Sequence, residues 1–200
     1  MRHSLHAEGF GVRLRPVRLE DAPFIVWLRN LEHVKGWVGD SANDVSNQQA
    51  WLNKYFEREG DYYFLVETLG GLPLGTHGIY NRTGESAEKG RHIVRPEVLA
   101  GVPAAMLAND LAFNQMHLTE LRANAVSTNT AVLSLHRKCG FQQVGIARAA
   151  QVINGEPVDL VQWVLTVEAW SKVRPRLVPL AEFAGGHITE WEQSQFALTR

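Results

Sequence analysis

The chain has 200 residues, a length that suits one self-sufficient core, and its 20 Lys and Arg nearly balance its 21 Asp and Glu, for a net charge of -1. This balance argues against a nucleic-acid partner, which would require a basic face, and against a basic membrane-surface helix. The single cysteine, Cys139, excludes an intrachain disulfide and a cysteine-based zinc site. The sequence shows neither a secretory signal nor a run of about 20 apolar residues, so we expect a cytoplasmic protein with no membrane partner.

The first half of the chain predicts one strand, two short helices and a three-stranded meander. Residues 12–17 alternate apolar and polar side chains, which indicates a half-buried strand. Acidic residues followed by Pro23 mark a helix start, and Ser46 can cap a second helix. Aromatic and β-branched residues separated by turn residues predict the strands of the meander, at 62–67, 74–80 and 88–94.

The second half alternates helices with strands. An apolar stripe predicts a helix over 104–117, and Gly140 in the C′ position ends another helix over 129–139. Strands are expected at 120–127, 141–153 and 158–167, the last two forming a hairpin. This order predicts an α/β fold with one mixed, twisted sheet of about seven strands flanked by about four helices, with parallel pairing in the second half.

Residues 171–200 differ from the rest of the chain. Pro175 and the pair Gly185-Gly186 interrupt the pattern, so we expect a less regular C-terminal extension after one domain at 1–170. Trp191 within it suggests that the extension docks on the domain or contacts a second copy in a homodimer.

Four stretches of the chain carry a family resemblance. They are Leu14-Arg15-Pro16 with Trp27-Leu28-Arg29-Asn30; Ala87-Glu88-Lys89-Gly90 running to Val94-Arg95-Pro96-Glu97; the helix from Asn129 through His136 to Gly140-Phe141; and the hairpin at Asn154-Gly155 that leads to Trp170. Together, over 12–170, they resemble the GNAT superfamily of N-acetyltransferases. The branch they resemble contains ribosomal-protein, spermidine and amino-sugar-nucleotide acetyltransferases.

The resemblance implies acetyl-CoA as co-substrate, with its pyrophosphate at a helix N-terminus and its pantetheine arm along a strand. A backbone N–H near Ile93 would polarise the thioester carbonyl. The phosphate loop departs from the family pattern, because Val98 stands at the first glycine position and its Cβ crowds a close phosphate approach. The residues expected to bind the cofactor are His92, Ile93, Val94, Arg95, Val98, Leu99, Ala100, Gly101, Val102, Asn129 and Lys138.

The resemblance also implies catalytic residues. His136 occupies the position where the family usually has a tyrosine that protonates the departing thiolate, and an imidazolium has a proton to give. Glu88 lies where the family often has a glutamate that drains the amine proton through water. Each residue also has an alternative without a catalytic role. His136 can be a partly exposed histidine near a helix C-terminus, and Glu88 can be a solvated carboxylate at a strand end. Cys139 is expected to be a buried small side chain, and no histidine spacing matches a metal-ligand motif, so no metal is expected.

The acceptor is expected on the side of the first helix, where the residues assigned to substrate binding are Trp27, Arg29 and Asn30, with His77 on a nearby strand. These residues favour a small-molecule amine, an amino-sugar nucleotide, over a protein N-terminus. A polyamine or aminoglycoside stays possible because the same half of the chain carries carboxylates, at Glu20, Asp21, Glu32, Asp40 and Asp44. A non-catalytic GNAT-fold module also stays possible, because the phosphate loop is altered.

Overall fold

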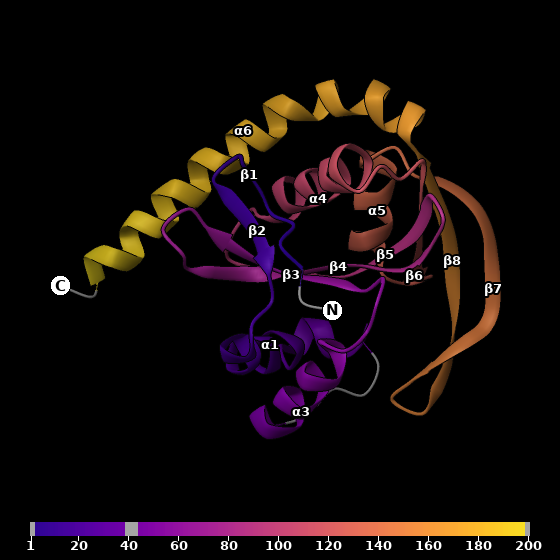
Figure 1. Cartoon of the computed structure of the whole chain (residues 1–200), viewed down its shortest axis with the longest axis horizontal. Coiled ribbons are helices and arrows are strands. Elements are labelled where there is room, and N and C mark those ends of the chain that lie inside the picture. The colour runs from indigo at the N-terminus through magenta and orange to yellow at the C-terminus, as the bar shows by residue number, and fades with distance from the viewer. Residues whose placement is uncertain (1–2, 39–43, 199–200) are drawn as a thin grey trace.

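The structure is a computed structural model that describes residues 3–38 and 44–198. These residues form one eight-stranded sheet in the order β1-β2-β3-β4-β5-β6-β8-β7 (Figure 1). All neighbouring strands are antiparallel except β5 and β6, which run parallel. The strands are β1 (Ala7–Gly9), β2 (Val12–Pro16), β3 (Tyr62–Thr68), β4 (Pro73–Thr83), β5 (Ser86–Val94), β6 (Glu120–Val126), β7 (Gln142–Ile153) and β8 (Glu156–Thr166).

Helices cover both faces of the sheet. In Figure 1 the helices α1 and α3 lie below the sheet, whereas α4, α5 and α6 lie above it. Their bounds, with the short α2 and a π-helical turn at Leu111–Gln115, are α1 (Ala22–Arg29), α2 (Glu32–Lys35), α3 (Val45–Tyr55), α4 (Gly101–Asp110), α5 (Thr130–Lys138) and α6 (Val167–Leu198). Among the described residues, none of these helices is both long enough and apolar enough to cross a membrane.

The alternation along β2 shows how the sheet divides its side chains between the two layers. Val12 and Leu14 are fully buried in the larger apolar cluster, which lies between the sheet and α4. Arg13 and Arg15 point to the opposite face, because successive strand residues alternate sides. A smaller apolar cluster, around Ile25, lies between the helices α1 and α3 and the sheet. The predicted α/β fold with one mixed sheet is confirmed.

Parallel pairing is rarer than the sequence predicts. It joins only β5 to β6 in the described sheet, because β8 returns from its hairpin and inserts antiparallel between β6 and β7. The sheet also has one strand more than expected. The short β1 carries no alternation to reveal it, and a tight turn with positive φ at Phe10 (53°) and Gly11 (76°) folds it onto β2.

The predicted irregular tail is wrong. α6 is one helix of 32 residues that curves over the α4 side of the sheet (Figure 1). It buries Leu177, Ala181 and Ile188 in the main core, and this burial outweighs the low helix propensity of its prolines and glycines. At Gly185 a Cβ would lie 2.8 Å from the carbonyl group of Phe10, so the helix and the β1–β2 turn meet backbone to backbone.

The cap of α3 also differs from the prediction. Asp44, not Ser46, occupies the N-cap position, and its side chain accepts the Asn47 N–H at 2.8 Å. Counting α2 and α6, the described residues form six α-helices where about four are expected from the sequence.

Candidate active site

The sheet forks where β5 and β6 separate. Their parallel pairing begins at Ser86 and Glu120 and ends at Lys89 and Ala123, although both strands continue beyond that point. β6 stays paired with β8 throughout, so the free edge belongs to β5. Within the described sheet, residues 90–94 have no strand partner on the side of β6. An extended chemical group can pair with such an edge through main-chain hydrogen bonds.

A β-bulge lies directly beyond the fork. Arg91 and His92 of β5 both stand opposite the single residue His77 of β4. Arg91 has a φ of 52°, and the Thr76 hydroxyl donates to its carbonyl oxygen at 2.8 Å. A bulge leaves backbone groups outside the ladder, where an N–H can polarise a bound carbonyl.

The loop from Arg95 to Ala100 carries β5 into α4 without glycine. No residue from 95 to 100 has a positive φ, and the Val98 side chain turns into the core. The expected crowding of a phosphate by Val98 stays a prediction. At the first position of α4, a Cβ on Gly101 would meet no atom closer than 3.9 Å. Gly101 and Val102, at the start of α4, are half-buried, and the first-turn N–H groups of a helix suit a phosphate group.

Arg95 is held between two tryptophans at this end of the sheet. Its guanidinium lies 5.0 Å from the ring centroid of Trp27 in α1 and 5.0 Å from that of Trp191 in α6. Glu97 accepts from its Nε at 2.7 Å. Trp27, expected to bind substrate, therefore packs on the phosphate loop, and the C-terminal helix contacts the loop through Trp191.

Basic side chains gather on the α4 side of the fork. His77 Nδ1 and His92 Nδ1 are 2.9 Å apart, and Lys89 donates to Asn109 Oδ1 at 2.6 Å. Burial lowers the pKa of Lys89 to about 8. Burial, reinforced by the charge of Lys89, lowers the pKa of His92 to about 3 and the pKa of His77 well below its ordinary value. At neutral pH these imidazoles are uncharged and Lys89 supplies the positive charge.

His136 lies on α5 next to the same cluster. It is 8% exposed, and its ring centroid lies 5.0 Å from Phe141 and 5.5 Å from Trp163. Burial, followed by the charge of Lys89, lowers the pKa of His136 to about 3. The imidazole is consequently neutral at pH 7, and it can offer an N–H hydrogen bond but little acidic strength.

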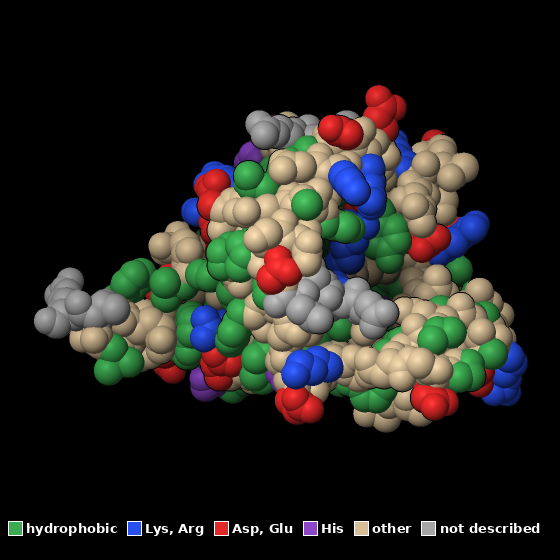
Figure 2. Space-filling view, turned by 90° about the horizontal axis from the view of Figure 1, so that it is seen from below, with side chains coloured by type: hydrophobic (Ala, Val, Ile, Leu, Met, Phe, Trp, Pro, Cys, Tyr) green, Lys and Arg blue, Asp and Glu red, His purple; other side chains and the backbone are tan. Residues whose placement is uncertain are grey.

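The opposite face of the fork lies under α1 and α3. Glu88 stands beside Tyr80 of β4. Arg91 forms a bidentate ion pair with Asp61, with N–O distances of 2.5 and 2.9 Å, and lies 4.5 Å from the Tyr80 ring centroid. Burial and the charge of neighbouring Arg91 lower the pKa of Arg29, which α1 brings to this place. Figure 2 looks onto this face and shows Lys and Arg side chains gathered in a hollow.

Other residues predicted for the site either cap helices or lie exposed at the surface, and His77 faces α4. Asn30 donates to the Val26 carbonyl at 2.8 Å and closes α1. The side chain of Asn129 caps α5 by accepting the Val132 N–H at 3.2 Å. Lys138 is exposed at the last position of α5. His77 faces α4, on the side of the sheet opposite to Arg29, and Leu99 is 53% exposed on the loop.

Cys139 is buried, as expected. Its side chain is 1% exposed, and burial raises the pKa of its thiol. No group of three or more His, Cys, Asp or Glu in the described ranges could hold a metal ion.

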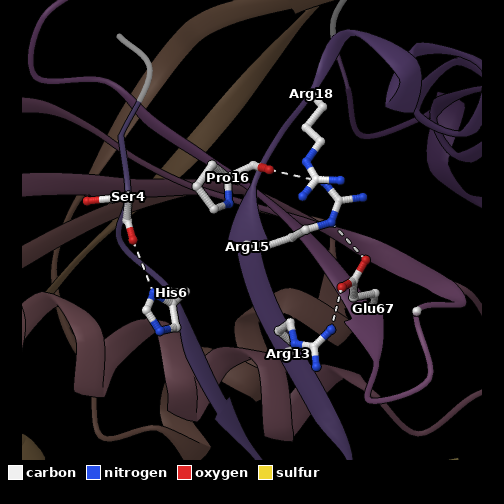
Figure 3. A pocket seen from close by; sticks show the side chains of 8 residues that line it. Ser4, His6, Arg13, Arg15, Pro16, Arg18 and Glu67 are labelled. Atoms are coloured by element: carbon white, nitrogen blue, oxygen red, sulfur yellow. Dashed lines mark hydrogen bonds and ion pairs between the residues drawn. The ribbon is translucent and has the colours of Figure 1, made fainter.

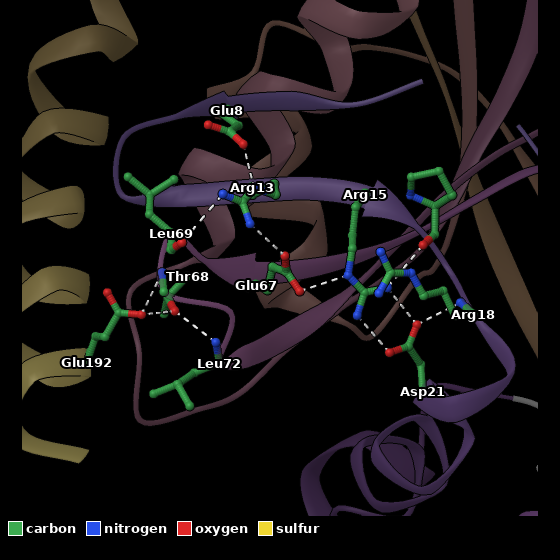
Figure 4. A network of polar contacts seen from close by, with 12 residues as sticks. Glu8, Arg13, Arg15, Arg18, Asp21, Glu67, Thr68, Leu69, Leu72 and Glu192 are labelled. Carbon is green, nitrogen blue, oxygen red and sulfur yellow. Dashed lines mark hydrogen bonds and ion pairs between the residues drawn. The ribbon is translucent and has the colours of Figure 1, made fainter. Parts of the chain in front are cut away.

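A separate hollow of about 610 Å³ lies over β2 and β3, distant from the fork in strand order. Its lining, shown in Figure 3, consists of Ser4, His6, Arg13, Arg15, Pro16, Arg18, Glu67 and Gly71. The two strand arginines are already paired: both contact Glu67, and Arg15 also holds Asp21 at 2.8 Å (Figure 4). These ion pairs join β2, β3 and the start of α1, so the arginines of this hollow have a structural role.

A family model described as an acetyltransferase (GNAT) domain matches residues 12–142. The chain belongs to this family. Membership makes it a GNAT acetyltransferase. Among curated proteins, none matches the sequence.

Solved structures share the GNAT fold at low sequence identity. FdhC, described as a nucleotide-linked sugar GNAT, is 22% identical with a TM-score of 0.73, over 91% of this chain and 99% of that chain. Spermidine N-acetyltransferase from Vibrio cholerae with CoA and spermine is 20% identical with a TM-score of 0.73, over 82% and 99%. Mycobacterium smegmatis RimJ with CoA-disulfide is 22% identical with a TM-score of 0.72, over 86% and 90%.

Sequence reasoning missed Lys89, Arg91 and Asn109. Lys89 shares a face of β5 with the buried Ala87, so period-two alternation marks it as inward-facing. Glycine within β4 was a second signal, because a Cβ on Gly78 would lie 3.0 Å from the Arg91 side chain. Nothing in the sequence singles out Asn109.

Proposed function

We propose that the protein transfers the acetyl group of acetyl-CoA to the primary amine of a small anionic acceptor, an amino sugar linked to a nucleotide. The observation that carries this proposal is Arg29, a half-buried arginine on the α1 and α3 side of the fork, next to Arg91, whose own guanidinium is held in place by Asp61. Guanidinium groups recognise phosphate through paired hydrogen bonds. The likeness to FdhC, described as a nucleotide-linked sugar GNAT, supports the same class of acceptor.

A polyamine suits this side poorly, because a cationic acceptor needs carboxylates and would be repelled by arginines. Of the carboxylates that favoured a polyamine, the described ones are not assembled into one site; they are Glu20, Asp21, Glu32 and Asp44. Asp21 is paired with Arg15, and Asp44 caps α3. Glu20 and Glu32 are exposed, and Asp40 lies outside the described residues.

The α4 side of the fork suits acetyl-CoA. The half-buried N-terminus of α4 at Gly101 would hold the pyrophosphate, and the free edge of residues 90–94 would pair with the pantetheine arm. Buried polar atoms without a protein partner, among them His136 Nδ1, leave hydrogen bonds for a ligand to satisfy. Arg95, Asn129 and Lys138 remain proposed cofactor contacts at the rim.

In the proposed reaction the neutral amine attacks the thioester carbonyl directly. A backbone N–H near Ile93 stabilises the oxyanion, and Glu88 accepts the amine proton through water. His136 gives a hydrogen bond to the sulfur. Holding both reactants in the fork can contribute about 7–11 kcal/mol to the rate acceleration.

The donor half of this proposal is tested by thermal shift with acetyl-CoA, with CoA, and with ADP as a phosphate control. A ligand at 100 times its Kd stabilises by about 2.7 kcal/mol, and for a chain of this size the expected rise in Tm is about 5–10 °C. A saturable rise with acetyl-CoA beyond the ADP effect supports the enzyme. No rise at millimolar acetyl-CoA would leave a GNAT-fold module with another role.

The acceptor half is tested by thiol release from acetyl-CoA with nucleoside-diphosphate amino sugars, spermidine and a peptide with a free N-terminus. We expect release with the sugar nucleotide, and an at least tenfold higher KM for it in Arg29→Met. The same change at Arg176, exposed on α6, is the control. Release with spermidine alone would refute the anionic acceptor and leave the acetyl-CoA site intact.

A further inference from the structure

Lys89 is a buried lysine without an acidic partner in the described chain. Its side chain donates to the neutral Asn109 Oδ1 at 2.6 Å, and its Nζ lies 5.3 Å from the ring centroid of Phe141. The residue is only 6% exposed. A buried ammonium without a counter-ion is costly, so such a group either gives up its proton or waits for an anion.

The groups around Lys89 are not acidic at neutral pH. Those within electrostatic reach are His77 on β4, His92 on β5, His136 on α5 and the Cys139 thiol that follows α5. From α4 it meets Asn109. A carboxylate from any of these elements would have stabilised the ammonium, and none of the described ones is hydrogen-bonded or ion-paired to it.

Several buried polar atoms in this region also lack partners. They are His77 Nε2, Asn109 Nδ2, His136 Nδ1 and Trp163 Nε1. The amide and indole nitrogens are hydrogen-bond donors, as is the ammonium itself. Native proteins leave few buried donors unpaired, so this concentration of donors indicates a place for an acceptor atom carrying negative charge.

The position of Lys89 in the sheet indicates which negatively charged atom would occupy this place. Lys89 is the last residue of β5 that pairs with β6, so it lies at the bottom of the fork. The strand from Lys89 to Val94 leads up to the loop and the start of α4, a path of roughly 16 Å at about 3.3 Å per residue. A CoA molecule with its pyrophosphate at α4 and its arm along this edge brings its sulfur to the bulge at Arg91 and His92, and His92 lies within electrostatic reach of Lys89.

We propose that Lys89 is a catalytic residue, whose ammonium stabilises and then protonates the thiolate of departing CoA; the inference rests on the proposed function. As the new C–N bond forms and the C–S bond breaks, the bonding electron pair moves to sulfur. Lys89 Nζ gives one proton to that sulfur and is left as a neutral amine. The nitrogen of the acceptor loses its proton to water through Glu88, and Lys89 regains one from solvent, so the overall proton count balances.

This assignment separates Lys89 from His136. The burial that holds the pKa of Lys89 at about 8 makes it a proton donor matched to neutral pH. The pKa of His136, at about 3, leaves that imidazole without a proton to give at the same pH. His136 then acts as a hydrogen-bond donor beside the acid.

The experiment needs no acceptor. CoA is titrated with pH on the intact protein, and the ultraviolet absorbance of the thiolate gives the thiol pKa of bound CoA. We compare the unmodified protein with Lys89→Met and Lys89→Gln, and we use acetyl-CoA, which has no thiol, to check binding. We expect the bound thiol pKa to be at least one unit lower in the unmodified protein than in either variant, a tenfold preference for thiolate.

Lys89→Met removes a buried charge and is expected to fold. If this variant does not fold, Lys89→Gln is the substitute, because its amide can still form a hydrogen bond to Asn109. Lys172→Met, on the exposed side of α6, is the matched control and should leave the thiol pKa unchanged. Tight CoA binding with an equal thiol pKa in all variants would overturn the role of Lys89 and leave the acetyltransferase standing. Failure of both CoA and acetyl-CoA to bind the unmodified protein would instead refute the proposed function, and this inference with it.

Discussion

Buried neutral histidines make the stability of this protein sensitive to mild acid. In the unfolded chain a histidine has a pKa near 6.5, whereas in the fold the pKa of His136 is about 3 because of burial and Lys89. Between these two values the unfolded state binds more protons, so stability falls as pH falls. Over the 1.5 units from pH 6.5 to 5.0, at about 1.36 kcal/mol per unit, His136 alone costs about 2 kcal/mol.

The assay is urea unfolding at pH 7 and pH 5, followed by tryptophan fluorescence. His92 has a similarly lowered pKa, of about 3, and adds a loss of similar size, so the two together remove about 4 kcal/mol from a typical stability of 5–15 kcal/mol. We expect His136→Phe, which fills the space beside Phe141 and Trp163, to lose about 2 kcal/mol less than the unmodified protein between these pH values.

His187→Phe, at an imidazole whose side chain is 49% exposed on α6, controls for the loss of a histidine as such. Equal m-values at both pH values establish that the comparison is of stability and not of a changed unfolded state. If His136→Phe loses as much stability between pH 7 and pH 5 as the unmodified protein, then His136 is protonated in the fold at pH 5. The conclusion that His136 is neutral because of its burial would then be wrong.

Further predictions concern α6 and its contacts. Trp191→Ala removes one side of the Arg95 stack, worth about 0.5–2 kcal/mol, and should raise the KM for acetyl-CoA several-fold with little change in kcat. Gly185→Ala should lower the Tm by several degrees, because its Cβ would meet backbone at 2.8 Å, whereas Gly186→Ala, with open space around it, should stabilise by about 0.5–1 kcal/mol. Glu192→Ala should cost about 0.5–1.5 kcal/mol and speed hydrogen exchange at the end of α6, because the exposed Gly70 N–H exchanges its acceptor at 2.9 Å for water.

Neighbouring positions on the same helix provide the controls. Phe183→Ala removes an aromatic side chain that is 61% exposed, and it should leave the KM for acetyl-CoA unchanged. Glu190→Ala removes a largely exposed carboxylate and should leave exchange in α6 unchanged. A raised KM in Phe183→Ala, equal effects of the two glycine substitutions, or faster exchange in Glu190→Ala would each contradict the corresponding contact.

The sequence was sufficient for the fold because most elements follow a local period. The strands of the meander and the hairpin at Asn154 and Gly155 lie where predicted, and Gly140 ends α5 in a left-handed conformation, with a φ of 83°. What local pattern could not reveal depends on tertiary contact. β1 is a strand because it pairs with β2. α6 continues as a helix through Gly185 and Gly186, where Gly185 packs against the backbone of the turn at Phe10.

The elements of the candidate site could be predicted from the sequence, whereas its electrostatics could not. The resemblance pointed to β5, the loop and α5, and the fork lies there. The charge of His136 depends on its burial against Phe141, just after α5, and Trp163 on the distant β8, so the local sequence pattern could not reveal it. Likewise, Arg95 was expected to meet phosphate, and its stacking on Trp191 required the path of α6 to be known.

The two proposals meet in the alternation of one strand. Glu88 and Lys89 are consecutive on β5, so their side chains lie on opposite faces of the sheet at the fork. In the proposed reaction the amine nitrogen must lose a proton on the α1 and α3 side, while the sulfur must gain one on the α4 side. A carboxylate on the first face and an ammonium on the second match both demands. None of the described carboxylates pairs with Lys89, where an anion would compete with the thiolate. The alternation of a single strand thereby keeps base and acid apart, which two residues on the same face could not do without neutralising each other.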